Sequence, residues 1–412
     1  MGAGIEQNMC EGTEKECKGN AQMNNVEQTR GHEGPLAGVV VVELCDNASG
    51  PFGAQILAQL GADVWKVERP TGDASRKWGP STWRGSGAPF HALNRGKRML
   101  SIDIKDPEQL SKLKLFVHQR ADVFMHNLRP GTSSKYGLDS ESLRASSPAL
   151  IHCEIGAFGH LGPLKDRPGY DPLMQAFAGI MSLTGEEGRP PARAGVSIVD
   201  FGSGMWAVIG ILSALFNRQA GNGGTAVSGS LLETAISWMT VGIANYNVDG
   251  EPGARHGSGA GFIVPHRAYE ASDGLFLAIG AANDSIFARL CKVLDHPQWA
   301  TDTRFTTNSA RLEHRIEIDT LIGNQISSDT RAYWQARLEQ AGVPVAPVQS
   351  TAELVAHEQT RALGILLSPP DDPIEMVGLP LSFDGVRPQI HCGARDLGVD
   401  NAAMDSILES RR

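Results

Sequence analysis

The chain has 412 residues, 41% of them hydrophobic and 20% charged, an ordinary composition for a globular protein with one large or two medium domains. Its 46 acidic residues outnumber its 37 basic residues and give a net charge of −9, which argues against nucleic acid or an anionic membrane surface as a general partner. Any anionic ligand must therefore be bound by basic residues that gather locally.

Cysteine spacing and the N-terminal composition indicate the cellular environment of the protein. The six cysteines are scattered, without a CxxC pair or a Cys/His spacing that suits zinc, so we expect a reducing, cytoplasmic environment and no metal site. No apolar run reaches the length of a membrane span, so no membrane partner is expected. Residues 1–34 lack the apolar core of a signal peptide, and we interpret them as a disordered polar tail.

The first half of the chain alternates strand and helix patterns. VVVVEL (39–44) is a continuous apolar run, which favours a strand buried on both faces of a parallel sheet. Gly50-Pro51 opens an amphipathic helix that leads to a second strand at 62–68. The alternation continues with strands predicted at 101–104, 122–127 and 149–155 and with helices after Asp106-Pro107 and near 140–146. The fold class is therefore α/β with a mostly parallel sheet.

The second half changes in texture near residue 250. Before that point, apolar stretches predict helices at 172–185, 203–219 and 231–246. After it, a Gly-rich segment and a hairpin around Ser272-Asp273-Gly274 precede helices predicted at 284–294, 308–326 and 329–341, which we expect to form a smaller second domain. The runs VPVAPV (343–348) and GILLSPP (364–370) are candidate strands for a return to the first sheet.

The turn after the first strand argues against a nicotinamide cofactor. It reads CDNASGPFGAQ (45–55) and lacks the spaced glycines that let a backbone approach a pyrophosphate. Without that turn, Glu68 at the end of the second strand is better interpreted as a cap or a surface charge than as a ribose-binding acid. Basic residues that follow the strands suit either phosphate groups or a solvated loop; these are Arg69, Arg76, Lys77, residues 94–98 and Lys105.

Two aspartates stand directly before stretches rich in small residues. Asp171 lies in GYDPLMQAFAGIM (169–181) and Asp200 in SIVDFGSGMW (197–206). An Asp at such a place is most often a helix N-cap, and the pattern leaves a cap and a catalytic carboxylate open for both. The histidines show no HExxH or paired ligand spacing.

Seven segments in unbroken order identify a family resemblance. They are PLAGVVVVEL (35–44), GPFGAQILAQLGADVWKVERPTGD (50–73), NRGKRMLSIDIKDP (94–107), HNLRPGTSSKYGL (126–138), GYDPLMQAFAGIM, SIVDFGSG and FIVPHRAYEASDG (262–274). Through them, over about residues 35–395, the chain resembles the class III CoA-transferases, which include formyl-CoA, carnitine and succinyl-CoA:glutarate transferases and the related α-methylacyl-CoA racemase. The segment HGSGAGFIVPHRAYEASDG is most similar to the succinate-glutarate branch.

The resemblance implies a covalent mechanism. Asp200 matches the family's nucleophile, whose carboxylate carries CoA as a thioester between two carboxylic acids. One thioester is exchanged for another, so acyl-CoA is the substrate and no permanently bound cofactor is expected. Gly257, Gly259 and Gly261, which His266 follows, match a loop that closes over the site.

The resemblance also implies a mixed polar and apolar pocket for CoA. Lysine and arginine would meet the phosphates, while apolar side chains and backbone edges would hold the adenine. The matching residues are Arg69, Ile102, Lys105, Asn127, Leu128, Lys135 and Tyr136, with Ala157 and Phe158 beside the pantetheine arm. Gly156 stands about where the oxalate-specific relatives have a lysine, so a different acid is implied.

Two alternatives remain beside the transferase. The racemase pairs its aspartate with a histidine in the motif GHD; here the motif is Gly169-Tyr170-Asp171, and tyrosine is a poor base at neutral pH. A catalytically silent CoA-ester-binding protein is disfavoured because Asp200 is retained. We therefore predict a succinyl-CoA-dependent transferase with a dicarboxylic acid acceptor.

The domain organisation is also inferred from the resemblance. Residues 35–225 and 345–412 would form a large Rossmann-like, CoA-binding domain, and residues 226–335 a small α+β domain between linkers. Two such chains would interlock as a homodimer, because long structureless linkers in an isolated monomer would be costly.

Overall fold

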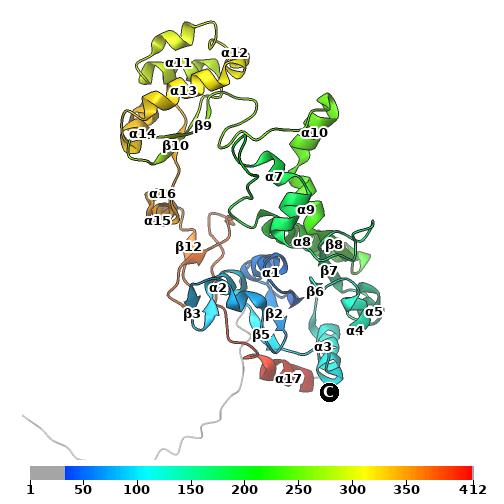
Figure 1. Cartoon of the computed structure of the whole chain (residues 1–412). Helices are drawn as coiled ribbons and strands as arrows, with labels where there is room; N and C mark the ends of the chain where they lie inside the picture. Colours follow the sequence, from blue (N-terminus) through cyan, green and yellow to red (C-terminus); the bar gives the residue numbers. More distant parts are fainter. Residues whose placement is uncertain (1–32, 411–412) are drawn as a thin grey trace, which may run out of the picture. The chain divides into compact units, whose positions relative to one another are not determined.

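The computed structural model describes residues 33–410 (Figure 1). The predicted polar tail, residues 1–34, lies outside the described residues except for its last two. The described part is a mixed α/β structure around a six-stranded parallel sheet, which confirms the predicted fold class.

The first strand of the chain, β1, lies in the middle of the central sheet. Neighbouring strands are parallel throughout, in the order β5 (Arg98–Ser101), β2 (Asp63–Glu68), β1 (Val40–Leu44), β6 (Val123–His126), β7 (Ile151–Gly156) and β8 (Ala226–Ser230). The chain first builds outward from β1 to β5 and then returns to start at β6 on the other side. The carboxyl ends of β1 and β6 thus lie at a topological switch point, where open α/β sheets bind ligands.

Helices cover both faces of this sheet. On one face α1 (Ser49–Gln59) and α8 (Ile198–Asn217) pack against the apolar residues Val41, Val64 and Ile151. On the other face the core contains side chains of α3 (Pro107–Arg120), α5 (Ser140–Ser146) and α17 (Asn401–Glu409). Burial on both faces explains why β1 is a nearly continuous apolar run.

Glycines bring α1 and α8 into backbone contact. A Cβ atom on Gly204 would lie 2.5 Å from the Ser49 carbonyl oxygen, and one on Gly53 would lie 2.9 Å from the Gly204 carbonyl oxygen. Only residues without a side chain permit this approach. The position of α8, which carries Asp200, is therefore fixed against the helix that follows β1.

One stretch in the described part, Ile198–Asn222, is long and apolar enough to cross a membrane by length and composition, with a mean hydropathy of 1.7. The statement that no apolar run reaches that length is therefore wrong for α8. Half of its most apolar window is buried inside the molecule, and its small residues pack on α1 in the core. A core helix of a globular protein passes the same test.

The C-terminal helix covers the open edge of the central sheet. The Asp400 carboxylate accepts a hydrogen bond from Met99 N at 2.8 Å, and the Asn401 side chain accepts from Ser101 N at 2.9 Å. These side chains occupy the position of a further strand beside β5 and satisfy its edge. The return of the tail to the first sheet is thus made by α17 and not by the predicted strands.

A second, antiparallel sheet has the order β11 (Val345–Pro347), β10 (Phe276–Gly280) and β9 (His266–Glu270). The predicted hairpin at 272–274 connects β9 and β10, as expected. The run 343–348 forms β11 in this sheet, and 364–370 contributes β12 (Leu366–Leu367), which pairs with β13 (Met376–Val377). The expectation that these runs return to the first sheet is therefore wrong.

Helices around the second sheet enclose their own core, with Phe287, Ile322 and Trp334 among its fully buried members. They are α11 (Asp284–Val293), η3 (Pro297–Thr301), α12 (Asn308–Glu313), α13 (Arg315–Ile326) and α14 (Arg331–Gln340), followed along the chain by α15 (Thr351–Ala356) and α16 (Glu358–Ala362). The predicted helix 308–326 is interrupted at His314, the C-cap of α12.

Shorter elements connect the strands of the central sheet. They are η1 (Ala74–Lys77), β3 (Thr82–Trp83), β4 (Ser86–Gly87), α2 (Ala88–Asn94), α4 (Thr132–Tyr136), α6 (Asp171–Phe177), α7 (Ile180–Leu183), η2 (Arg218–Asn222), α9 (Leu231–Trp238) and α10 (Thr240–Asp249). The helices predicted at 172–185 and 231–246 are thus each divided in two, and the strand predicted at 101–104 ends at Ser101. The division into two domains stays a prediction; β8, at its boundary, pairs with β7.

Candidate active site

Asp200 lies half-buried in the first turn of α8. Burial raises the pKa of its carboxyl to about 7, and the nearby Asp171 carboxylate adds to the rise. A carboxyl group of this kind is a stronger base than an ordinary aspartate and is still ionised in a large fraction of molecules near neutral pH.

Asp171 holds the start of that helix from outside. It is the first residue of α6 and is only 2% exposed. Its carboxylate accepts hydrogen bonds from Val199 N at 2.7 Å and from Asp200 N at 3.2 Å. Asp171 therefore caps α8, a helix that begins far from it in the sequence. Its carboxylate satisfies backbone N–H groups at the start of α8, so these groups are not available to the Asp200 carboxylate.

Gln175 extends this arrangement to the segment before α8. Its side-chain amide donates to the Asp171 carboxylate at 2.6 Å, and its carbonyl oxygen accepts from Ala194 N at 2.9 Å. One turn of α6 thus positions both Ala194 and the first residues of α8. These contacts fix the backbone at Asp200 without using its carboxyl group.

The glycine-rich loop is joined to the segment that leads into α8. Gly257, with a φ of +62°, donates from its N–H to Gly185 O at 2.9 Å. Arg255 donates to the carbonyl oxygens of Glu186 at 3.3 Å and Arg189 at 2.9 Å. In the described part of the chain no hydrogen bond or ion pair joins Asp200 to Gly257, Gly259, Gly261 or His266.

A cavity of about 370 Å³ lies beside this loop. Its buried wall contains Tyr269, whose hydroxyl donates to Asp319 at 2.7 Å, and Arg267 forms an ion pair with the same carboxylate at 3.4 Å. Burial and the Asp319 charge raise the pKa of the Tyr269 hydroxyl. The lining carries arginines and acids together; these are Glu186, Glu187, Arg255, Arg267, Glu270, Arg315 and Asp319.

The residues predicted to contact CoA gather at the carboxyl edge of the central sheet. Arg69 follows β2, Ile102 follows β5, Asn127 and Leu128 follow β6, and Ala157 and Phe158 follow β7. Lys105 precedes α3, and Lys135 and Tyr136 end α4. The structure thus places them at the end of the sheet where the fold positions ligands, and their contact with CoA stays a prediction.

Several of these residues already have partners within the chain. Ile102 is buried in the core, Lys135 lies over the Tyr136 ring, and Phe158 packs edge-on against Phe177. Arg69 forms an ion pair with Asp46. A second carboxylate on the substrate would need its own cation, and His91 and Arg95 are not available for that role because they are buried and contact backbone oxygens.

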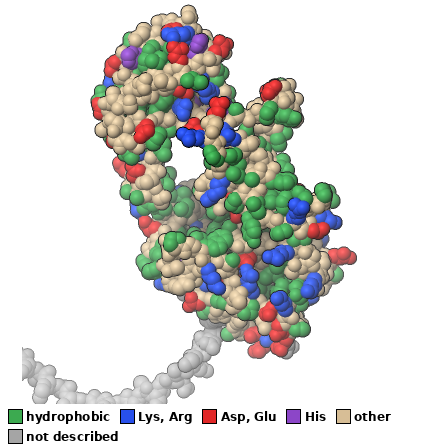
Figure 2. Space-filling model, viewed as in Figure 1, with side chains coloured by type: hydrophobic (Ala, Val, Ile, Leu, Met, Phe, Trp, Pro, Cys, Tyr) green, Lys and Arg blue, Asp and Glu red, His purple; other side chains and the backbone are tan. Residues whose placement is uncertain are grey.

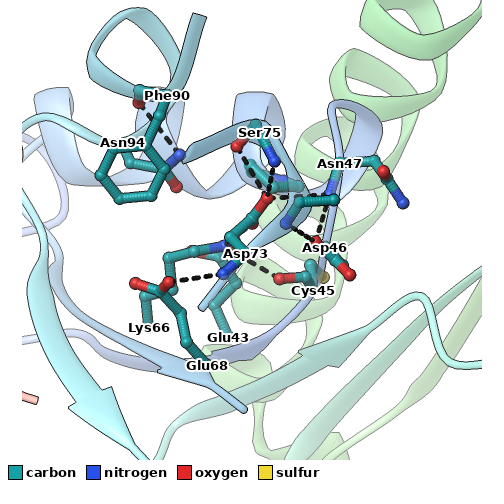
Figure 3. Close-up of polar contacts among 12 residues, drawn as sticks. Glu43, Cys45, Asp46, Asn47, Lys66, Glu68, Asp73, Ser75, Phe90 and Asn94 are labelled. Atoms are coloured by element: carbon teal, nitrogen blue, oxygen red, sulfur yellow. Dashed lines mark hydrogen bonds and ion pairs between the residues drawn. The ribbon is translucent and has the colours of Figure 1, made fainter. Parts of the chain in front are cut away.

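Sequence reasoning missed a buried ionic network below the switch point. Lys66 lies between Glu43 and Asp73, with its Nζ atom 3.2 Å and 2.8 Å from their carboxylates (Figure 3). Lys97 contacts the other oxygen of Glu43 at 2.8 Å, and burial lowers the pKa of Lys97 to about 8. The signal was present, since Glu43 and Lys66 interrupt two apolar strands and face each other in register.

Comparisons with known proteins now identify the family. The family model described as CoA-transferase family III matches residues 36–401. This chain belongs to CoA-transferase family III. It is 37% identical to the succinate–glutarate CoA-transferase of Agrobacterium fabrum over 338 residues, covering 80% of this chain and 84% of that protein.

Further relatives of this CoA-transferase agree with that assignment. The succinyl-CoA:glutarate CoA-transferase of Homo sapiens is 31% identical, covering 87% of this chain and 80% of that protein. The crystal structure of a CAIB/BAIF family protein from Brucella suis is similar with a TM-score of 0.84 and 36% identity, covering 91% of this chain and 99% of that one. The predicted enzyme class, a CoA-transferase, is confirmed.

Proposed function

We propose that this CoA-transferase moves CoA from succinyl-CoA to a dicarboxylic acid through a thioester on Asp200. The observation that carries the proposal is the Asp200 carboxyl at the start of α8, whose pKa is raised to about 7 and whose backbone N–H donates to Asp171. Relatives named for succinyl-CoA with glutarate and with D-citramalate support the choice of acids.

The chemistry proceeds in two symmetrical halves. The Asp200 carboxylate attacks the thioester carbon of the donor, so that a mixed anhydride forms and CoA leaves as a thiolate. The thiolate then attacks the Asp200 acyl carbon and releases the donor acid, which leaves the enzyme as an aspartyl-CoA thioester. The acceptor carboxylate attacks that thioester and the same two steps run in reverse. Atoms and charges balance without ATP or a metal ion.

The environment of Asp200 favours the first step. An ionised carboxylate in a buried site beside Asp171 is destabilised, and acylation converts it to a neutral group. Loop N–H groups of Gly257, Gly259 and Gly261 are proposed to stabilise the oxyanion, with His266 beside them, after a movement that releases Gly257 N from Gly185 O and Gly259 N from His256 O. Closure would exclude the water that hydrolyses the anhydride. The CoA residues are proposed as Arg69, Ile102, Lys105, Asn127, Leu128, Lys135, Tyr136, Ala157 and Phe158.

The assembly is proposed to be an interlocked homodimer. Helix α10 buries none of its residues, although it carries Val241, Ile243 and Tyr246, and α8 exposes Trp206 and Phe216. Figure 2 shows hydrophobic side chains at the surface of the molecule. A ten-residue helix is marginal without tertiary packing, and exposed apolar surface on this scale is typical of an interface. We propose that a second copy covers it, in a cytoplasmic protein whose described cysteines are free thiols.

The test is a transfer assay of the pure protein with succinyl-CoA and a panel of dicarboxylic acids, with the products identified by mass spectrometry. New CoA esters of the diacids are expected. If succinyl-CoA is only hydrolysed to succinate and free CoA, or if no acid of the panel receives CoA, the proposed function is wrong.

A further inference from the structure

Asp46 occupies the switch point of the central sheet. It stands two residues after the end of β1, the strand that lies between β2 and β6, and no sequence pattern singled it out. Figure 3 shows it beside Asn47, which adopts a left-handed conformation with a φ of +70°. A non-glycine residue in that region marks a turn that the surrounding contacts determine.

Asn127 fixes the backbone of Asp46 from the neighbouring strand. The Asn127 side-chain oxygen accepts from Asp46 N at 2.9 Å, and its amide nitrogen donates to Asp46 O at 2.7 Å. Both hydrogen-bonding groups of the Asn127 side chain are thus used to join the ends of β1 and β6. Asp46 has a defined position before any ligand arrives.

The two carboxylate oxygens of Asp46 have separate tasks. Oδ1 accepts from Ala74 N at 2.8 Å and from Asn47 N at 3.0 Å, which connects the β1 and β2 turns. Oδ2 forms an ion pair with the guanidinium of Arg69. Arg69 also donates from Nε to Gly72 O at 3.1 Å, so two sides of its planar group are held.

We infer that Asp46 is a positioning residue, which orients the Arg69 guanidinium toward a phosphate group of CoA at the carboxyl edge of the sheet. This inference rests on the proposed role of Arg69 in CoA binding. The N–H groups of Arg69 that Asp46 and Gly72 do not engage remain able to donate to phosphate oxygens. Asn127 would then contribute to CoA binding through Asp46 as well as through direct contact.

Orientation outweighs repulsion between Asp46 and the phosphate. The Arg69 and Asp46 side chains are 55% and 32% exposed, so a carboxylate on the far side of the guanidinium is screened by water and by salt. A free arginine side chain must lose its rotamer freedom when it binds a ligand, whereas a side chain held in place has already lost it. Removing Asp46 is therefore expected to weaken CoA binding.

The variant Asp46→Asn isolates this role. The amide oxygen can still accept from Ala74 N and Asn47 N, while the amide nitrogen opposes the Arg69 donors and breaks the pair. Asp122→Asn is the matched control, because Asp122 also accepts a backbone N–H, from Val40 at 2.8 Å, and pairs with Arg218 at 2.9 Å, but precedes β6 at the opposite end of the sheet. If Asp46→Asn fails to fold, Asp46→Ser keeps a short acceptor at the turn and serves instead.

The measurement is the Kd of CoA itself by isothermal titration calorimetry. Asp46→Asn is expected to raise the Kd about three- to tenfold, the scale of one charged contact, and Asp122→Asn to leave it within about twofold. In an Arg69→Ala background Asp46→Asn should have no further effect, as a double-mutant cycle requires of a residue that acts through Arg69.

Three outcomes would overturn the inference: an unchanged or lower Kd in Asp46→Asn, the same rise in the Arg69→Ala background, or an equal rise in the control. The proposed function is tested separately by transfer activity. A protein that binds CoA with these shifts but transfers nothing loses the proposed function and keeps the role of Asp46. If Arg69→Ala binds CoA and transfers it normally, the role of Asp46 is wrong and the proposed function stands.

Discussion

Asp171 and Asp200 lie 29 residues apart in the sequence, and the carboxylate of the first accepts a hydrogen bond from the backbone N–H of the second at 3.2 Å. Two acidic groups are thus held next to each other at one helix start, and they have different tasks. Asp171 is buried and bonded to amides and to Gln175, while Asp200 is half-buried with a pKa raised to about 7. This division supports the proposal that Asp200 is the reactive group.

Replacing Asp200 by alanine should lower CoA transfer roughly a thousandfold or more, because the proposed covalent attachment point is lost. The fold should persist, since the amides at the start of α8 are bonded to Asp171. Incubation with acyl-CoA and cleavage by hydroxylamine should mark Asp200 by peptide mass analysis. A label on Asp171, or full activity of the variant, would contradict the assignment.

The transfer rate should rise with pH through about 7, because only ionised Asp200 attacks the thioester. Stability should show the opposite trend. The folded-state pKa lies above the ordinary value of 3.8, so folding favours the protonated form, and stability falls as the pH rises from about 4 to about 7. Asp200→Asn should therefore be stabilised relative to the natural protein at pH 8 more than at pH 4. Denaturation by urea at both pH values measures this difference, and a larger gain at pH 4 would contradict it.

Asp171→Asn should move the midpoint of the pH–rate profile to lower pH. The amide oxygen can still accept from Val199 N and Asp200 N, but the negative charge that helps to raise the pKa of Asp200 is removed. Single-turnover rates between pH 5 and 9 (roughly the range a stable enzyme tolerates) give the midpoint. Asp122→Asn, which also replaces an Asp that accepts a backbone N–H, serves as control and should leave it unchanged. A lower rate with the same midpoint would mean that Asp171 acts on geometry alone.

Local patterns predicted the elements whose structure depends on neighbours in the sequence. The strands β1 and β2 were assigned correctly, and the apolar run of β1 reflects burial on both of its faces. Asp106 begins α3 as expected and accepts from Glu108 N at 2.8 Å. Such signals lie within a few residues of the element that they define.

Long-range contacts were not predictable in the same way. Asp171 caps a helix that begins at Ile198, and Asp400 satisfies the strand at Met99, so neither partner could be inferred from spacing. The run 343–348 was correctly interpreted as a strand, but its sheet depends on which edge is open in three dimensions. The site residues followed from the family resemblance, whereas Asp46 needed the fold.

Gly257→Ala should reduce transfer by disturbing the glycine-rich loop. A Cβ atom there would lie 2.1 Å from the Glu186 carboxylate, and the φ of +62° is unfavourable for alanine. Gly274→Ala is the control, with a similar φ of +73° at a hairpin and its nearest atom 4.0 Å away. Steady-state assays should show a loss of about tenfold or more for Gly257→Ala only, on the scale of one lost oxyanion donor or less. Adding Glu186→Ala should restore part of the rate; if it restores none, contact with Glu186 is not the cause.

The preference for dicarboxylic acids can be tested directly. A second carboxylate needs its own cation or donors, and burying it unpaired would be costly. Arg267, which pairs with Asp319, lines the cavity beside the glycine-rich loop, and His266 begins β9. His91 and Arg95 are buried and contact backbone oxygens. Succinate and glutarate should therefore be preferred over butyrate by at least about tenfold in kcat/KM, the scale of one lost charged contact. Arg267→Ala should reduce this preference while leaving transfer to butyrate nearly unchanged, and Arg289→Ala, which replaces an exposed arginine on α11, should alter neither.

Equal rates with butyrate and succinate would refute a diacid pocket and leave the transferase standing. Deuterium exchange at the α-carbon of a 2-methylacyl-CoA, with racemisation, would instead support the racemase alternative, although Tyr170 stands where that reaction places its histidine.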